Sequence, residues 1–272
     1  MSLNLSVSLV IYKSDLKLLQ KTVSSLNQAV LLAKQQKKHL GCLLIIVNNC
    51  RQDNNHFSQA LHMALRMHWE GEFKIHESEK NLGYGIGHNQ AINHYCKDFH
   101  LVINPDVTVD EMAVINAIDY MQNNPQVGML TPSSQQANGK KEYLCKSYPT
   151  VFVLLLRGFA PQKIKILFDK QLLAYELSEL PEEINTDIKI TSGCFMFFKG
   201  EALKSINGFS DKYFLYFEDF DLCIRLEQHW KIAYVPKVKI IHYGGRAGKK
   251  GVLHIWLFIC SAWQFFNEHG WK

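Results

Sequence analysis

Short apolar runs alternate with longer stretches of helical periodicity in the first half of the chain. The runs have the length of buried strands and lie at residues 5–12, 43–47, 73–75 and 101–103. Between them, residues 15–38 and 57–67 carry apolar side chains every three or four positions, which places these side chains on one helix face. A further helix is expected to open at the glycine-rich residues 83–87. This alternation predicts an α/β fold with a mostly parallel sheet and helices on both faces.

The pattern becomes less regular after about residue 130. Residues 133–141 are polar and contain glycine, which predicts a loop, and residues 151–159 are apolar without strand alternation. Short strands are expected at residues 188–190, 195–198, 232–235 and 239–242. Helices are expected at residues 201–206 and 218–227. No flexible linker separates the two halves, so the sequence indicates one composite α/β domain.

Composition excludes several classes of protein. With 272 residues, 47% of them hydrophobic, the chain can bury a sizeable core and is not a disordered protein. The net charge of +5 is mild, and the basic residues lack an interleaved aromatic platform, so no nucleic acid is expected as a partner. No apolar stretch reaches the roughly 18 to 20 residues of a membrane-spanning helix.

Cysteine spacing and the start of the chain predict the compartment. Seven cysteines form no CxxC pair, and their odd number argues against a disulfide framework, which favours a reducing, cytoplasmic environment. The apolar residues 3–12 follow no basic residue and precede no small-residue cleavage site, so they are expected to form a first strand instead of a signal peptide.

Polar residues follow four of the predicted strands. They are Tyr12, the pair Asn48 and Asn49, the segment 81–89, and Asn104 to Asp106. Ligands of open α/β sheets bind at the carboxyl ends of the strands, so these positions are candidates for a binding site. The glycines of segment 81–89 lack the acidic ribose ligand of a dinucleotide fingerprint. They fit either a tight turn before a helix or a close backbone approach to a diphosphate, with Asn89 and helix N–H groups as donors.

Carboxylates occur at two places that suit chemistry. Asp106 ends the fourth strand, and one carboxylate together with a substrate diphosphate can hold a magnesium or manganese ion. His242 follows an apolar strand and would add a nitrogen ligand, which suits manganese better. The acidic cluster of Glu218, Asp219 and Asp221 lies among aromatic residues. It complements a helix dipole, and burial would raise a carboxylate pKa toward that of a general base.

The order of these motifs resembles the family-2 glycosyltransferases with the GT-A fold, and among them the rhamnosyltransferase-like branch. The segments that carry the resemblance are SLVIYKSD, IIVNNC, NLGYGIGHNQAI, LVINPDV, SGCFMFF, GFSDKYF, YFEDFDLCIR and VPKVKIIHYGG. The resemblance covers nearly the whole chain. It implies a single GT-A domain over residues 1–248, with a nucleotide-binding half up to about residue 130 and an acceptor half over about 131–248. An apolar helix over residues 249–272 would follow.

The resemblance implies a role for each matched residue. Asp106 corresponds to the metal-binding Asp of the degenerate DXD motif, and His242 to a histidine near the diphosphate and metal. Asp219, preceded by Glu218, corresponds to the base that deprotonates the acceptor hydroxyl. The nucleotide-sugar pocket is assigned to Tyr12, Asn48, Asn81, Gly83, Asn89, Asn104 and Asp106. The acceptor and sugar side is assigned to Ser192, Gly193 and Asp221.

Two positions depart from the family pattern. Asn48 stands where an Asp usually contacts the nucleoside, and Asn104 stands where many relatives have an acid in the metal-binding motif. These departures leave open a catalytically weak protein that binds a sugar nucleotide or acts as a scaffold. A nucleotidyltransferase is disfavoured because residues 12–15 supply no glycine-rich, basic phosphate loop.

The family implies an inverting transfer from a nucleotide-diphosphate sugar with the help of Mg²⁺ or Mn²⁺. The first choice of donor is dTDP-rhamnose, and a UDP-hexose is the second. The acceptor is expected to be a saccharide or a polyprenyl-diphosphate-linked saccharide in cell-surface polysaccharide synthesis. The protein is then expected in the cytoplasm, at the inner face of the cell membrane.

The C-terminal segment leaves two alternatives open. Residues 252–266 are rich in Trp and Phe and follow Arg246, Lys249 and Lys250, a composition typical of a helix in a membrane interface. The same segment would also suit a helix packed on the protein core or on a partner.

Overall fold

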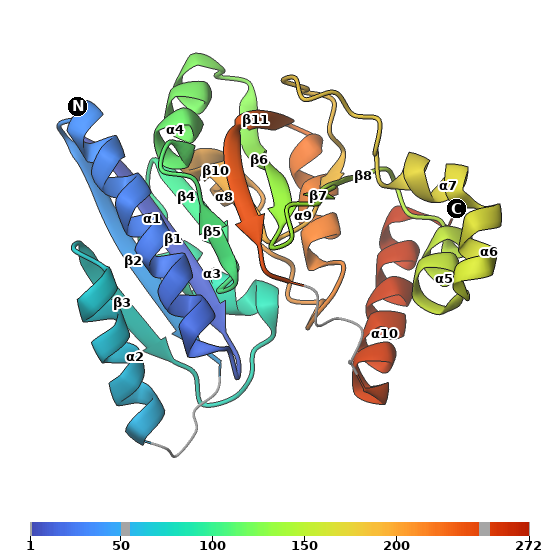
Figure 1. Ribbon diagram of the computed structural model, residues 1–272, viewed down its shortest axis with the longest axis horizontal. Helices are drawn as coiled ribbons and strands as arrows, with labels where there is room; N and C mark the ends of the chain where they lie inside the picture. Colours follow the sequence, from blue (N-terminus) through green and yellow to red (C-terminus); the bar gives the residue numbers. More distant parts are fainter. Residues whose placement is uncertain (1, 50–54, 245–250, 272) are drawn as a thin grey trace.

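The computed structural model describes residues 2–49, 55–244 and 251–271 (Figure 1). Over these residues a nine-stranded sheet has the order β3-β2-β1-β4-β10-β6-β11-β5, and β7 pairs with β6. Four neighbouring parallel strands form one side of it: β1 (Leu3–Ile11), β2 (Leu40–Asn48), β3 (Glu72–Glu77) and β4 (Phe99–Ile103). The other side is mixed and contains β5 (Val107–Val109), β6 (Val127–Gln136), β7 (Lys141–Glu142), β10 (Phe195–Lys199) and β11 (Lys231–His242).

Helices cover both faces of the sheet, as the sequence pattern predicts. One face packs against α1 (Leu16–Gln36), α2 (Asn55–His68) and α4 (Ala113–Asn123) in a single apolar cluster. The opposite face is covered by α3 (Tyr84–Tyr95), α8 (Gly200–Ser205) and α9 (Glu218–Glu227). Asp15 caps α1, because its side chain accepts hydrogen bonds from the N–H groups of Lys17 and Leu18.

The second half differs from the sequence expectation at two places, and it adds a helix where the sequence pattern assigned no element. The expected loop over residues 133–141 is largely strand, since β6 runs to Gln136 and pairs with β7. The two expected strands at 232–235 and 239–242 are one strand, β11, whose register shifts between Val235 and Lys239. The apolar residues 151–159 form helix α5 (Val151–Phe159), because Thr150 accepts a hydrogen bond from Val153 N as its N-cap.

The remaining elements lie beside the mixed part of the sheet. Helix α5 is followed by α6 (Gln162–Leu167) and α7 (Asp169–Tyr175). A small two-stranded sheet joins β8 (Cys145–Lys146) to β9 (Ile190–Thr191). Figure 1 shows α5, α6 and α7 grouped with the C-terminal helix at one end of the molecule. The expected division into two halves near residue 130 stays a prediction.

Helix α10 (Val252–His269) has one packed face and one exposed face. Phe265 and Phe266 are buried against an aromatic cluster that includes Tyr213 and Phe217. Trp256 and Trp263 on the other face are each 62% exposed. Both features weighed from the sequence are therefore present, a core-packed side and a Trp-rich free side. The basic residues Arg246, Lys249 and Lys250 lie outside the described residues.

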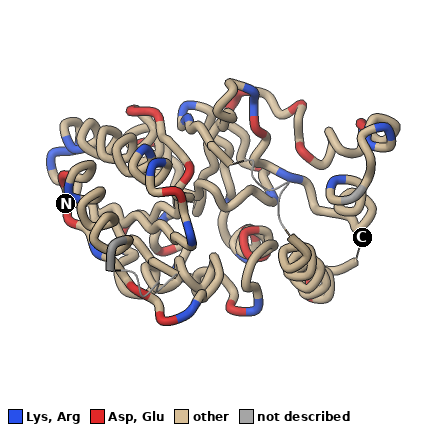
Figure 2. The backbone as a smooth tube through the Cα atoms, turned by 60° about the horizontal axis from the view of Figure 1, so that its bottom comes forward, with Lys and Arg blue, Asp and Glu red and all other residues tan. Residues whose placement is uncertain are grey.

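The charge distribution and the hydropathy of the helices bear on whether the chain could contact or span a membrane. Lys, Arg, Asp and Glu positions are scattered over the molecule, whereas the tube through α10 is tan for most of its length (Figure 2). None of the helices in the described part of the chain is both long enough and apolar enough to cross a membrane.

Candidate active site

A cleft of about 580 Å³ opens where β1, β4 and β11 end, and we call it the donor cleft. It collects six of the residues singled out from the sequence: Tyr12, Asn81, Gly83, Asn104, Asp106 and His242. They converge because parallel strands end at the same edge of the sheet, and because β11 runs parallel to β6 and delivers His242 to that edge. Their binding roles remain predictions.

The end of β2 contributes a different asparagine from the one assigned to the pocket. Asn48 Nδ2 donates to Glu77 Oε2 at 2.8 Å, within the sheet. Asn49 lines the donor cleft and donates to Gly83 O at 2.7 Å. Successive side chains of a strand point in opposite directions, so the assignment differs from the structure by one residue.

Asn89 has a structural role in place of the donor role expected for it. Its Nδ2 donates to Phe209 O at 2.8 Å, and its Oδ1 accepts from Phe209 N at 3.0 Å. These two bonds fix the turn at Gly208, and Asn89 is absent from the described lining of the donor cleft. The Asn89 amide already makes hydrogen bonds within the protein, because α3 packs on the segment that precedes α9.

Gly83 allows a close approach between two backbone segments that line the donor cleft. Its φ of +80° is rarely adopted by other residues, and a Cβ there would lie 2.1 Å from Phe214 O. The next residue, Tyr84, donates its N–H to the same carbonyl at 3.1 Å. Asn81 Oδ1 accepts from Gly83 N at 3.0 Å. The glycine turn therefore joins the start of α3 to the segment before α9.

Asp106 and His242 meet in the donor cleft together with a third residue, Glu142. His242 Nε2 lies 3.5 Å from Asp106 Oδ1, and His242 Nδ1 lies 3.1 Å from both oxygens of Glu142. Burial alone would lower the pKa of His242, but hydrogen bonds with Asp106 and Glu142 outweigh it and raise the pKa to about 9. The ring is thus held between two carboxylates.

These residues fit a divalent cation. Asn104 Oδ1 is buried and accepts no hydrogen bond among the described residues, and buried Asp106 Oδ1 has only the long 3.5 Å contact with His242 Nε2 among them. Buried oxygens without a donor are costly, and a hard cation would satisfy both of them. Asp106 and Asn104 offer oxygen ligands that suit Mg²⁺ or Mn²⁺ together with substrate phosphates, and His242 Nε2 would add a nitrogen ligand after a cation displaces its proton.

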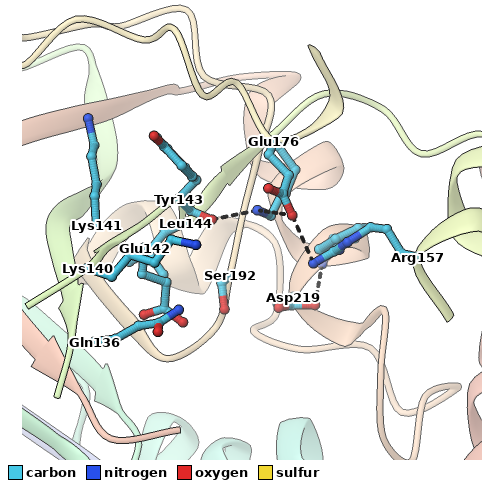
Figure 3. A pocket seen from close by; sticks show the side chains of 12 residues that line it. Gln136, Lys140, Lys141, Glu142, Tyr143, Leu144, Arg157, Glu176, Ser192 and Asp219 are labelled. Carbon is cyan, nitrogen blue, oxygen red and sulfur yellow. Dashed lines mark hydrogen bonds and ion pairs between the residues drawn. The ribbon is translucent and has the colours of Figure 1, made fainter. Parts of the chain in front are cut away.

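A second cleft, of about 380 Å³, lies beside Asp219, and we call it the acceptor cleft (Figure 3). The predicted residues Asp219 and Ser192 both line it, while Gly193 borders Asp219 from behind. The two clefts share no lining residue among the described residues. The Glu142–His242 pair connects them, because Glu142 lines the acceptor cleft and His242 lines the donor cleft.

Asp219 is held by the backbone around it. Its Oδ2 accepts from Gly193 N at 2.8 Å, and its Oδ1 accepts from Phe220 N at 3.0 Å. Tyr84 OH donates to Gly193 O at 2.5 Å, which fixes the same residue through its carbonyl. Burial raises the pKa of Asp219 to about 6, although the two backbone bonds act to lower it. A carboxylate of this kind is suited to proton abstraction near neutral pH.

The other two acids of the α9 cluster are buried in the structure. Glu218 precedes Asp219 in the first turn of the helix and is 5% exposed. Asp221, expected on the acceptor side, instead points into the protein, because Arg225 Nε at 2.8 Å and His269 Nε2 at 2.9 Å occupy its oxygens. The Asp221, Glu268 and His269 group has the spacing of a metal site. Lys212 and Tyr213 also bind Glu268, so the group acts as an ionic tie between α9 and α10.

Sequence reasoning missed several residues of the site. Glu142 directly follows the segment 133–141 that was expected to be a loop, and only the long-range pairing of β6, β7 and β11 brings it to His242. Lys146 and Arg157 line the acceptor cleft from β8 and α5. Tyr84 was part of a recognised motif, but its contact with Gly193 spans 109 residues. No local sequence signal marks these contacts.

Comparison with curated proteins gives two kinds of relative. The N-acetylglucosaminyl-diphospho-decaprenol L-rhamnosyltransferase of Mycobacterium tuberculosis is 25% identical over 208 residues, which is 70% of this chain and 66% of that protein. Rhamnosyltransferase WbbL of Escherichia coli K12 is 26% identical over 174 residues, 59% of this chain and 61% of that protein. The chain thus spans just under two thirds of the length of these relatives. No family model matches the sequence.

Solved structures share the fold. GalNAc-T7 with UDP, GalNAc and Mn²⁺ superposes with a TM-score of 0.63 at 14% identity, covering 89% of this chain and 43% of that one. The mannosyltransferase PcManGT from Pyrobaculum calidifontis, with GDP-Man and Mn²⁺, gives a TM-score of 0.59 at 14% identity, covering 93% and 59%. These likenesses establish the architecture.

Proposed function

Since this chain is a rhamnosyltransferase-like protein with the GT-A fold of glycosyltransferases, we propose that it is an inverting glycosyltransferase. It moves a sugar from a nucleotide-diphosphate donor to a hydroxyl of a saccharide or lipid-linked saccharide, as a step in cell-surface polysaccharide synthesis. Rhamnose from dTDP-rhamnose is the first choice, because both curated relatives are named rhamnosyltransferases. A UDP-hexose is the second choice.

The observation that carries the proposal is a pair of clefts, one lined by Asp219 and the other by Asp106, which the Glu142–His242 pair connects. The donor cleft has oxygens suited to a cation and a diphosphate at Asp106 and Asn104. The acceptor cleft has Asp219, fixed by two backbone N–H groups and with its pKa raised to about 6. A base facing one cleft and an anion site in the other is the arrangement that a single displacement requires.

The proposed chemistry follows from these positions. Asp219 accepts the proton of the acceptor hydroxyl, and the acceptor oxygen forms a bond to the anomeric carbon. The bond between that carbon and the diphosphate breaks, and the nucleoside diphosphate leaves with the electron pair. Asp106, with Asn104 and His242, would hold a divalent cation, and the cation would supply positive charge for this leaving group, where negative charge grows in the transition state. Tyr12 and Asn81 would bind the nucleotide part of the donor.

The test is a matrix of donors with purified protein. Binding and transfer would be measured with dTDP-rhamnose, UDP-glucose and GDP-mannose, with Mn²⁺ and after chelation. We expect one donor to bind in the micromolar range or tighter and its sugar to appear on an acceptor with inverted anomeric configuration. Binding without transfer to any acceptor would favour the alternative that Asn104 suggests, a catalytically weak protein that binds a sugar nucleotide. Absence of binding to all three donors would contradict the proposal.

We also propose that α10 contacts a membrane surface and so brings the acceptor cleft to a lipid-linked acceptor. Its free face carries Trp256 and Trp263, and Leu253 is 68% exposed. On α6, which lies in the same group of helices, Ile166 and Leu167 are 65% and 79% exposed, beside the basic Lys163. Exposed Trp and aliphatic side chains next to cations favour anionic bilayer interfaces.

Vesicle flotation tests this contact. Removing α10 would strip Phe265 and Phe266 from their cluster, so point variants are cleaner than truncation. We expect Trp256→Ser with Trp263→Ser to lose binding to anionic vesicles at low salt, while the control Met67→Ser, 74% exposed on α2, keeps it. Equal flotation of both variants, or no flotation of the wild-type protein, would rule out this role of the helix.

A further inference from the structure

Two cations border the acceptor cleft and have no part in the steps above. Lys146 belongs to β8, and Arg157 belongs to α5. Figure 3 shows the Arg157 side chain reaching toward Asp219 and Glu176 across the cleft. The ring of Tyr175 lies 5.3 Å from the Arg157 guanidinium and supports its plane. The cations therefore face the space in which an acceptor would meet the proposed base.

The carboxylates near these cations have other partners as well: Asp219, toward which Arg157 points, is held by two backbone N–H groups (Figure 3). Glu176 is the shared partner, 3.2 Å from Arg157 Nη2 and 4.0 Å from Lys146 Nζ. Glu142, the other carboxylate on that side of the cleft, is engaged by His242. Lys146 is only 8% exposed, and its Nζ donates to Tyr143 O at 2.5 Å.

The surroundings of Lys146 also change its ionisation. Burial, and then the charge of Arg157, lower the pKa of Lys146 to about 8 in spite of Glu176. Burying a cation is costly unless an anion accompanies it. An anionic ligand in the cleft would supply that charge, and the planar guanidinium of Arg157 can bind phosphate oxygens with two parallel hydrogen bonds.

We propose that Arg157 and Lys146 bind a phosphate or diphosphate group of the acceptor, next to the hydroxyl that Asp219 deprotonates. The proposal rests on the proposed function, because it assigns the acceptor cleft. It separates two anion positions: the donor diphosphate lies with Asp106 and His242, and the acceptor phosphate lies with Arg157 and Lys146.

Direct binding tests the site without requiring transfer. With dTDP and Mg²⁺ present to fill the donor cleft, three probes would be titrated by calorimetry: citronellyl diphosphate, inorganic pyrophosphate and decyl glucoside. The variants are Arg157→Gln and Lys146→Met. The matched control is Lys204→Gln, an exposed lysine on α8 that lines neither cleft. Thermal unfolding and dTDP affinity report whether each variant is folded.

We expect citronellyl diphosphate to bind the wild-type protein and the control alike, and each variant at least tenfold more weakly. Decyl glucoside binding should be the same in all four proteins. Tighter binding of citronellyl diphosphate than of pyrophosphate would identify a lipid-linked acceptor, and equal binding a soluble phosphorylated one.

If Lys146→Met does not fold, Arg157→Gln carries the test, because Arg157 is largely exposed. Unchanged diphosphate affinity in folded Arg157→Gln, or no binding to the wild-type protein, would overturn the site. Failure of every donor in the transfer assay would remove the proposed function while leaving the binding result readable.

Discussion

The donor cleft and the acceptor cleft are built from different kinds of contact. Residues at the ends of β1, β4 and β11 form much of the donor cleft, and the ladder of parallel strands fixes their relative positions. The acceptor cleft is lined from β7, β8, α5, α7 and α9, which are brought together over long sequence separations. The comparison teaches that the residues proposed to bind the donor sit on the sheet, while the proposed base and the residues proposed to bind the acceptor sit largely on elements outside it, which can vary without disturbing the sheet.

The base should give the largest effect. Asp219→Asn can keep only one of the two backbone hydrogen bonds, because its amide has a single acceptor oxygen, and it cannot take a proton, so we expect kcat to fall by about 10² to 10⁴. Donor affinity should stay nearly unchanged, because Asp219 does not line the donor cleft. Steady-state kinetics and donor titration measure both quantities. A variant that keeps more than about a tenth of the wild-type rate would sink the assignment.

Changing the ligands of the proposed cation in the donor cleft should change the transfer rate and its dependence on the cation. Asp106→Ala removes the charged ligand, and cation stabilisation is worth several kcal/mol, so we expect transfer to fall by about 100-fold or more. The reciprocal variant Asn104→Asp adds a carboxylate and should lower the Mn²⁺ concentration for half-maximal rate. Metal titrations of both proteins give the answer. Full wild-type activity after exhaustive chelation would speak against this site.

The glycine turn at Gly83, which lines the donor cleft, can be tested through the stability of the protein. Gly83 and Gly139 share a φ of +80°, but a Cβ on Gly83 would meet Phe214 O at 2.1 Å, whereas nothing lies within 4 Å of Gly139. Gly139→Ala should lower the free energy of unfolding by about 1 to 2 kcal/mol from backbone strain alone. Gly83→Ala should lower it by more. Equal melting temperatures for the two variants would show that the close approach to Phe214 carries no energy.

The pH profile should give the smallest effect. Because burial raises the pKa of Asp219 to about 6, the base is ionised above that pH and protonated below it. We expect kcat/KM for the acceptor to be level on the alkaline side of pH 6 and to fall about tenfold per pH unit on the acid side. Initial rates between pH 5 and 8 would show the limb, and a flat profile down to pH 5 would exclude Asp219 as the titrating base.

Most of the parallel sheet could be predicted from the sequence, because apolar runs and helical periodicity are local signals. The same signals identified Tyr12, Asn81, Asn104 and Asp106 at strand ends. They could not decide whether Asn48 or Asn49 lines the donor cleft, since this depends on the direction in which each side chain points from the end of the strand. The GT-A fold followed from the order of motifs and agrees with the solved structures.

The acceptor side could not be predicted to the same extent, for physical reasons. Glu142 reaches His242 across 100 residues, and its strand has only two residues, too few for a periodic pattern. Asp221 looked like a companion of Asp219, but its partner His269 lies 48 residues away on α10. Contacts of this kind depend on tertiary packing, to which spacing along the chain gives no access.

The ionic tie between α9 and α10 has a thermodynamic consequence. Helix α10 cannot separate from the protein without breaking the contact of His269 with Asp221 and uncovering Phe265 and Phe266. Asp221 lies two residues beyond Asp219, in the same first turn of α9. Seating of α10 and ordering of that turn are therefore linked equilibria, and whatever holds α10 in place also holds Asp219 in register with Gly193.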